Sequence, residues 1–198
     1  MSDLKGSPLQ LPGRRLLLVR HATPHVDAGV PAERWHLSVR GRQEAQSLAM
    51  DLRLQLPRIW SSPETKARET ATFLAALSGA EVAVHDGLRE VGFRQGLLPE
   101  AEFRRRVASY LDGGADPDFE PYDVARQRIL RCLAEIAGLE GGGGDIALVS
   151  HGRILTVLVS ALLGRRLGGR LWSRIGMPDY AWFDLEHGVA LAGFAAVP

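Results

Sequence analysis

The stretch Leu16–His21 reads LLLVRH and carries an apolar run directly into a histidine. The stretch Ile146–His151 (IALVSH) does the same much later in the chain. Short aliphatic runs of this kind are typical of buried strands in a parallel sheet. In an open α/β sheet, ligands bind in the crevice beyond the carboxyl ends of the strands. We therefore expect His21 and His151 to share one pocket, which indicates chemistry rather than packing.

The remaining apolar runs predict the fold class. Runs at Arg58–Trp60 and Val82–Val84 alternate with stretches of helical periodicity, which is typical of strands joined by crossover helices. We expect an α/β fold, namely a three-layer α/β/α sandwich with a mostly parallel central sheet. Residues 180–185 and 189–194 predict a closing β-hairpin. Residues 97–120 predict an insertion made of a charged helix and a loop.

Two helix starts and one cysteine are predicted locally. Ser38 is a good N-cap for a helix that runs to Leu52. Pro63 suits the first turn of the next helix. Cys132, the only cysteine, lies in a helical apolar pattern and is expected to behave as a small core residue. A single cysteine excludes disulfides within the chain.

Length and charge limit the classes of partner. The 198 residues, 45% of them hydrophobic, suit one domain over residues 1–198. The 24 Lys and Arg residues nearly balance the 23 Asp and Glu residues, so we expect neither nucleic acid nor a membrane as partner. The longest apolar stretch, Ile154–Leu163, is much shorter than the ~20 residues that span a bilayer. With no apolar leader-like run among residues 1–15, the expected location is cytoplasmic.

Four motifs occur in order along the chain. Arg20-His21-Ala22 is followed by residues 61–71 (SSPETKARETA), then by residues 88–90 (LRE) and by residues 150–152 (SHG). The set resembles the histidine phosphatase superfamily, also called phosphoglycerate mutase-like. That family reads R-H-G, then S-S-P-L-x-R-A-x-x-T-A, then L-x-E and S-H-G. Any one of these motifs is a weak signal, whereas four in order are hard to obtain by chance.

The resemblance implies a role for each matching residue. His21 is the implied nucleophile, which attacks phosphorus and forms a phosphohistidine. Arg20 and His151 are implied to stabilise the charge of the transferring phosphoryl group. Glu90 is implied to be the general acid and then the base, a role for which we expect a pKa above that of a surface carboxylate. With cations around the phosphate, we expect no metal and no cofactor.

The chain departs from the family pattern at the second phosphate-binding position. Lys66 stands where the family has an arginine, and Arg68 points about 200° away from it on a helix. Lys66 is therefore the expected phosphate ligand, although an ammonium lacks the two-pronged geometry of arginine. Asp27 stands where the family often has an asparagine, and we expect it to cap a loop. The alternative is that Asp27 pairs with Lys66 or with an amine group of the substrate. Ala22 replaces a glycine.

Other histidines and aromatic residues carry weaker signals. His25 and Asp27 follow His21 closely, but Pro24 and the spacing argue against a metal site. His36, His85 and His187 are expected to be structural or surface residues. Scattered aromatic residues are more often core than pocket wall, although they could wall a pocket; these are Trp35, Phe93, Trp172 and Trp182.

The predicted function is that of a metal-independent phosphatase. It would hydrolyse a small-molecule phosphomonoester through a phosphohistidine on His21. Three alternatives remain: a weakly active or inactive phosphate-binding or interaction protein on the same fold, a phosphoglycerate mutase-like phosphotransferase, and a protein-histidine phosphatase. Lys66 and Asp27 are the residues that favour the first of these alternatives.

Overall fold

The fold is built on a central sheet. A computed structural model of the chain describes residues 11–141, 143–194 and 197. Its six strands lie in the order β3-β2-β4-β1-β5-β6. They are β1 (Arg15–Arg20), β2 (Arg58–Ser61), β3 (Glu81–Val84), β4 (Ile146–Ser150), β5 (Asp179–Asp184) and β6 (Val189–Gly193). The four strands β1, β2, β3 and β4 are parallel to one another. β5 pairs antiparallel with β1, and β6 pairs antiparallel with β5 at the edge of the sheet. The predicted mostly parallel sheet and the closing hairpin are confirmed.

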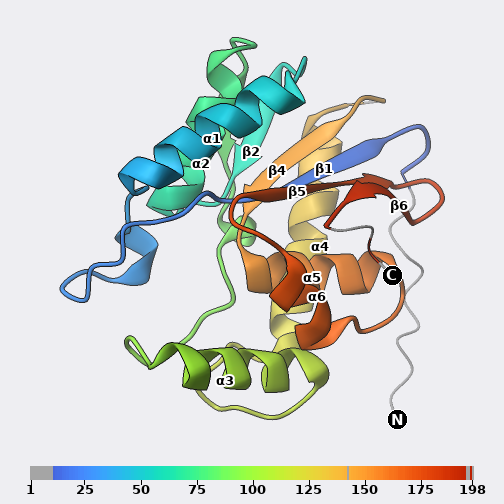
Figure 1. Cartoon of the computed structure of the whole chain (residues 1–198). Coiled ribbons are helices and arrows are strands. Elements are labelled where there is room, and N and C mark those ends of the chain that lie inside the picture. Colours follow the sequence, from blue (N-terminus) through green and yellow to red (C-terminus); the bar gives the residue numbers. More distant parts are fainter. Residues whose placement is uncertain (1–10, 142, 195–196, 198) are drawn as a thin grey trace.

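Helices cover both faces of this sheet (Figure 1). α1 (Val39–Leu52) and α2 (Thr65–Ala76) lie on one face, whereas α4 (Tyr122–Leu139) and α5 (Gly152–Leu162) lie on the other. α3 (Glu100–Asp112) packs against α6 (Gly168–Arg174) beyond α5. Two short 3-10 turns occupy Ala32–Arg34 and Asp86–Leu88. This arrangement is the predicted three-layer α/β/α sandwich.

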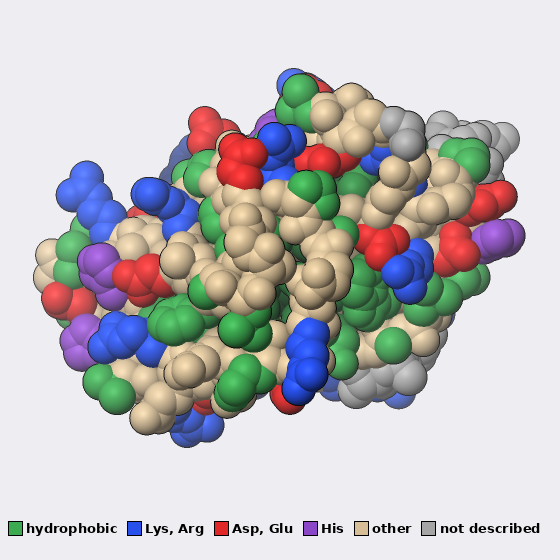
Figure 2. Space-filling view, turned by 90° about the horizontal axis from the view of Figure 1, so that it is seen from above, with side chains coloured by type: hydrophobic (Ala, Val, Ile, Leu, Met, Phe, Trp, Pro, Cys, Tyr) green, Lys and Arg blue, Asp and Glu red, His purple; other side chains and the backbone are tan. Residues whose placement is uncertain are grey.

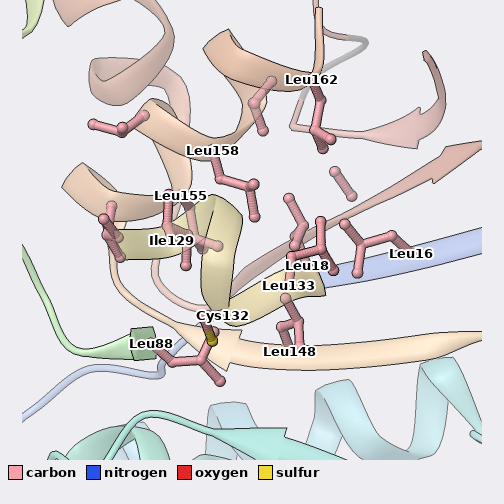
Figure 3. Packing of buried hydrophobic residues seen from close by; sticks show 14 of the residues in the cluster. Leu16, Leu18, Leu88, Ile129, Cys132, Leu133, Leu148, Leu155, Leu158 and Leu162 are labelled. Carbon is pink, nitrogen blue, oxygen red and sulfur yellow. The ribbon is translucent and has the colours of Figure 1, made fainter. Parts of the chain in front are cut away.

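Strand β1 separates two apolar cores. Leu16 and Leu18 belong to the core shared with α4 and α5, whereas Leu17 and Val19 belong to the core shared with α1 and α2. The four side chains have no exposed surface, which explains why the strand reads as a continuous apolar run. Figure 3 shows Leu16 and Leu18 beside the leucines of α5, with Cys132 in the same cluster as predicted.

The two predicted helix starts have different outcomes. Ser38 caps α1, because its Oγ accepts a hydrogen bond from Gly41 N at 2.9 Å. α2, however, begins at Thr65, so the prediction that Pro63 lies in its first turn is wrong. Residues 62–64 instead form a turn in which Ser62 Oγ accepts a hydrogen bond from Glu64 N at 3.2 Å. Glu64 therefore takes the N-cap position in an extended conformation.

Close packing of α1 against the segment after β1 gives a stability prediction. A Cβ on Gly41 would overlap the backbone carbonyl of Thr23. We expect Gly41→Ala to lower the free energy of unfolding by about 2 kcal/mol or more, because neither backbone can yield easily. Gly138→Ala is the matched control, since Gly138 lies in helix α4 with open space around it. It should raise stability by about 0.5–1 kcal/mol. Equal effects in urea titrations would contradict this packing.

The surface carries both signs of charge. Seen from above, basic and acidic side chains are interspersed over the face shown in Figure 2, in keeping with the balanced composition. Within the described residues, no helix combines the length and apolar character needed to cross a bilayer.

Candidate active site

The ends of three neighbouring strands bring the motif residues together. His21 follows β1, Ser62 follows β2 and His151 follows β4. Backbone hydrogen bonds fix these ends, from His21 N to Ser150 O at 3.0 Å and from Ser62 N to Val149 O at 2.9 Å. The rings of His21 and His151 lie edge to face with centroids 5.0 Å apart. The two strand-end histidines therefore lie side by side, as the ends of neighbouring parallel strands led us to expect.

His21 is held in one tautomer. Its Nδ1 lies 2.8 Å from the carbonyl oxygen of Ala22, and because a carbonyl only accepts, Nδ1 carries the hydrogen. The neutral ring therefore has its lone pair on Nε2. Burial, then the neighbouring His151 and Lys66, lower the pKa of His21 well below its ordinary value. The Ala22 backbone is fixed in turn, since its N–H donates to Thr70 Oγ1 at 3.1 Å.

The two ring nitrogens of His151 have different surroundings. Its Nε2 lies 2.7 Å from Ser62 Oγ. Its Nδ1 is buried and, among the described residues, has no hydrogen-bond partner. Burial lowers the pKa of His151 to about 3, against the opposing effect of Glu90 and with a further decrease from Lys66. An unpaired, buried nitrogen is costly unless a ligand completes it.

Arg20 is the cation at the end of β1. One terminal nitrogen donates to the carbonyl of Ile175 at 2.7 Å, and its buried Nε has no partner within the described part of the chain. Burial lowers the pKa of Arg20 below its usual value, while Glu90 and Asp179 act in the opposite direction. The guanidinium remains charged, because arginine does not lose its proton in proteins. Arg20 therefore supplies a fixed charge with an unused donor.

Glu90 lies at the N-terminus of α5. Its carboxylate accepts hydrogen bonds from the backbone of Val91 and Ile154, both at 2.9 Å, and pairs with Arg153 Nε at 3.2 Å. Burial on its own raises the pKa, but Arg153, His151 and the backbone donors outweigh it and lower the pKa of Glu90 to about 2. The expectation of a pKa above that of a surface carboxylate is wrong for this arrangement, because Arg153 and the donors at the helix terminus stabilise the ionised form.

The two basic residues of α2 lie on different faces, as predicted. Lys66 is buried, whereas Arg68 is exposed. The Lys66 ammonium donates to Glu64 Oε2 at 2.6 Å and to the carbonyl of Ala32 at 2.8 Å. Its charge is close enough to lower the pKa of both His21 and His151.

Glu64 is a site residue that the sequence interpretation missed. It stands where the family motif has leucine and is only 7% exposed. Its Oε1 accepts a hydrogen bond from Glu90 N at 2.8 Å and lies 3.5 Å from His151 Nε2. The available signal was a carboxylate at an apolar position, two residues before the lysine that replaces arginine.

Arg153 is a second residue that the sequence interpretation missed. Besides pairing with Glu90, its guanidinium lies 5.6–6.0 Å from the ring centroids of Phe93, Phe103 and Phe119. Such cation–π contacts hold the guanidinium against the segments around α3. Phe93, which the sequence analysis gave as either a core residue or part of a pocket wall, lies beside this arginine.

The residues kept outside the predicted site have hydrogen-bond or ion-pair partners of their own. Asp27 is exposed and caps its own loop, because its Oδ1 accepts from Gly29 N at 2.8 Å. His36 and His187 are exposed and pair with carboxylates, and His85 bridges Cys132 and Glu135. Among the described residues, no group of three or more His, Cys, Asp or Glu side chains is placed to hold a metal ion.

The two buried histidines predict an acid-sensitive fold. Their pKa is depressed in the folded chain, so the unfolded chain binds more protons as the pH falls below about 6.5. We expect the free energy of unfolding to fall by about 1.4 kcal/mol per pH unit for each histidine from that pH downward. Glu90 does not contribute here, because its stabilisation is lost only between about 4.5 and about 2.

Urea titrations between about pH 7 and about pH 5.5 measure this dependence. His151→Asn should reduce the slope by about half, since it removes one of the two titrating groups. A wild-type stability that does not change over this interval would contradict neutral, buried histidines.

The comparisons with known proteins agree with this geometry. The model of the histidine phosphatase superfamily (branch 1) matches residues 16–189. A probable phosphoglycerate mutase of Enterobacter sp. (strain 638) is 30% identical over 79% of this chain and 80% of its own. A glucosyl-3-phosphoglycerate phosphatase of Mycolicibacterium vanbaalenii is 29% identical over 87% of this chain and 84% of its own. The native structure of a mycobacterial glucosyl-3-phosphoglycerate phosphatase superposes with a TM-score of 0.65 and 28% identity, covering 85% of this chain and 89% of that one. The chain therefore belongs to the histidine phosphatase superfamily.

Proposed function

We propose that the protein is a metal-independent phosphatase that hydrolyses a small-molecule phosphomonoester through a phosphohistidine on His21. The observation that carries the proposal is the hydrogen bond between His21 Nδ1 and the Ala22 carbonyl. It leaves a lone pair on Nε2 of an imidazole whose pKa lies well below its ordinary value. Such a nitrogen is unprotonated near neutral pH and acts as a nucleophile without first losing a proton.

The proposed reaction has two displacement steps. In the first, His21 Nε2 forms a bond to phosphorus, and the bond between phosphorus and the leaving oxygen breaks. Glu90 gives its proton to that oxygen. In the second, Glu90 accepts a proton from a water molecule, whose oxygen attacks phosphorus while the bond to Nε2 breaks. The products are an alcohol and inorganic phosphate, and His21 and Glu90 return to their starting states.

Charge around the phosphoryl group comes from side chains of this chain. Arg20 brings a guanidinium with an unused buried Nε donor, and His151 brings an unpaired buried Nδ1, which donates in the tautomer whose Nε2 accepts from the Ser62 hydroxyl. Pre-arranged donors of this kind stabilise the charge that develops on the transferring group. Lys66 adds a third donor, since its ammonium uses two of its three hydrogens on Glu64 and Ala32.

The acid role of Glu90 depends on the substrate. In the ligand-free chain the pKa of Glu90 is about 2, so the carboxyl is ionised. A bound phosphate adds negative charge beside it, and a like charge raises the pKa of a carboxyl. Substrate binding is therefore coupled to proton uptake by Glu90. The protonated carboxyl is then the general acid of the first step.

The names of the similar proteins bear on the class of substrate. The similar proteins carry names of phosphatases and mutases that act on phosphoglycerate or its glucosyl derivative. This favours a small phosphorylated metabolite as the substrate here.

A second candidate is a protein on this fold that binds phosphate without turnover. The observation in its favour is the ion pair between Lys66 and Glu64 at 2.6 Å, which offsets one of the cationic charges.

Turnover of a chromogenic aryl phosphate in the presence of a chelator tests the proposed function. The purified protein should release inorganic phosphate and aryl alcohol in equal amounts, and added divalent metal should not increase the rate. Binding of phosphate or vanadate without any turnover would overturn the phosphatase and favour the second candidate. Transfer of the phosphoryl group to a second hydroxyl compound in preference to water would favour a mutase.

A further inference from the structure

A buried ion pair lies beside the two histidines. Glu64 and Lys66 are 7% and 6% exposed, and the Glu64 Oε2 and Lys66 Nζ atoms lie 2.6 Å apart. The second oxygen of Glu64 lies 3.5 Å from His151 Nε2. This carboxylate therefore lies beside Lys66 and His151, two of the residues proposed to bind the phosphoryl group, and the mechanism described above gives it no role.

The pair changes the net charge of the pocket. A carboxylate and an ammonium in contact cancel to a first approximation, so Lys66 adds a donor but little net charge. In the ligand-free chain, Glu90 and Arg153 cancel in the same way across 3.2 Å. The pKa of each histidine is depressed, which keeps both rings neutral near neutral pH. The other charged groups that act on Arg20 are Asp179 and Arg104. The groups that face Glu64 are Lys66, His151 and the backbone N–H of Glu90.

We propose that Glu64 is a specificity-determining residue that makes the pocket favour a singly charged tetrahedral oxyanion over a doubly charged one. The proposal rests on the proposed function, because it places the phosphoryl group beside His21 and His151. The form of the substrate that the protein would favour is the monoanion of a phosphomonoester. This form predominates below the second pKa of the phosphate group, about 6. Because Glu64 pairs with Lys66, the lysine charge is not available to neutralise the second negative charge of a dianion, and the buried carboxylate repels that charge. A buried carboxylate disfavours additional negative charge placed near it.

Calorimetric titration with two inorganic anions tests the proposal. Sulfate is doubly charged throughout, whereas phosphate at about pH 5.5 is mainly singly charged. The wild-type protein should bind phosphate more tightly than sulfate at that pH. Glu64→Gln keeps the shape of the side chain and removes its charge, and we expect it to shift the ratio of the two affinities toward sulfate by about tenfold. An unchanged ratio, or a shift toward phosphate, would overturn the proposal.

A double variant separates charge from folding. Glu64→Leu with Lys66→Met removes both charges, so the anion ratio should stay near that of the wild-type protein even if both affinities fall. A ratio like that of Glu64→Gln would contradict the charge argument. Glu69→Gln is the matched control, because Glu69 lies on the same helix and pairs with exposed His36. It should leave the ratio unchanged.

The readout is binding and not turnover, so two failures are distinguishable. A shifted ratio without aryl phosphate hydrolysis would overturn the phosphatase and leave the role of Glu64 standing. Hydrolysis with an unshifted ratio would overturn the role of Glu64 alone. Failure of both anions to bind the wild-type protein and Glu64→Gln would also overturn it.

Discussion

His21→Ala is expected to lower kcat for an aryl phosphate by about 10⁴-fold or more. The variant loses the nitrogen that would form the covalent bond to phosphorus, and no other side chain on this strand end replaces it. His21 packs against His151 and is 5% exposed, so the truncation also removes this ring contact. Steady-state kinetics, with circular dichroism to confirm folding, measure the effect.

His25→Ala is the control for this experiment. His25 follows His21 by four residues but is exposed, and it should retain activity within a few-fold of the wild-type protein. Retention of most of the turnover by a folded His21→Ala variant would show that the bond to phosphorus forms elsewhere. A similar loss in His25→Ala would point to general damage of the loop.

Glu90→Gln is expected to lower kcat by about 10²–10⁴-fold with a much smaller change in KM. The amide keeps the volume of the carboxyl, but it is not acidic enough to protonate the leaving oxygen and not basic enough to accept a proton from water. It also leaves Arg153 without its ion pair, so some loss of stability is expected alongside. The rate and the stability therefore need separate measurements.

Leaving-group dependence separates the acid role from a structural one. An aryl phosphate with an acidic phenol needs little protonation, whereas an alkyl phosphate needs it fully. Glu90→Gln should therefore depress the phosphorylation step much more for the alkyl substrate, as measured by kcat/KM. Equal losses in kcat/KM for both substrates would contradict proton donation by Glu90 and leave it as a positioning residue for Arg153 and α5.

The fold follows from local features of the sequence to a large extent. The aliphatic run Leu16–Val19 identified a strand buried on both faces, and the same pattern at Ile146–Val149 identified its parallel neighbour. Ser38 marked the start of α1 because capping is a local interaction. Pro63 misplaced the start of α2, because the turn at residues 62–64 depends on a side-chain hydrogen bond that propensity does not reveal.

The site could be predicted less completely. Strand ends placed His21 and His151 together, and helical periodicity separated Lys66 from Arg68. The low pKa of Glu90 could not be foreseen, because it depends on the N-terminus of α5, which comes more than 60 residues later.

The pairing of Glu64 with Lys66 escaped notice for a different reason. The two residues are close in sequence, but only the fold buries them together beside His151.

Rapid quenching of the reaction, followed by mass spectrometry of the peptides, tests the central claim most directly. Within one turnover of an aryl phosphate, the protein should carry one phosphoryl group on His21, stable in base and lost in acid. His151→Asn should still show modification at His21, if at a lower level. Phosphorylation at another residue, or turnover of the wild-type protein with no covalent phosphoryl group at any quench time, would contradict the account.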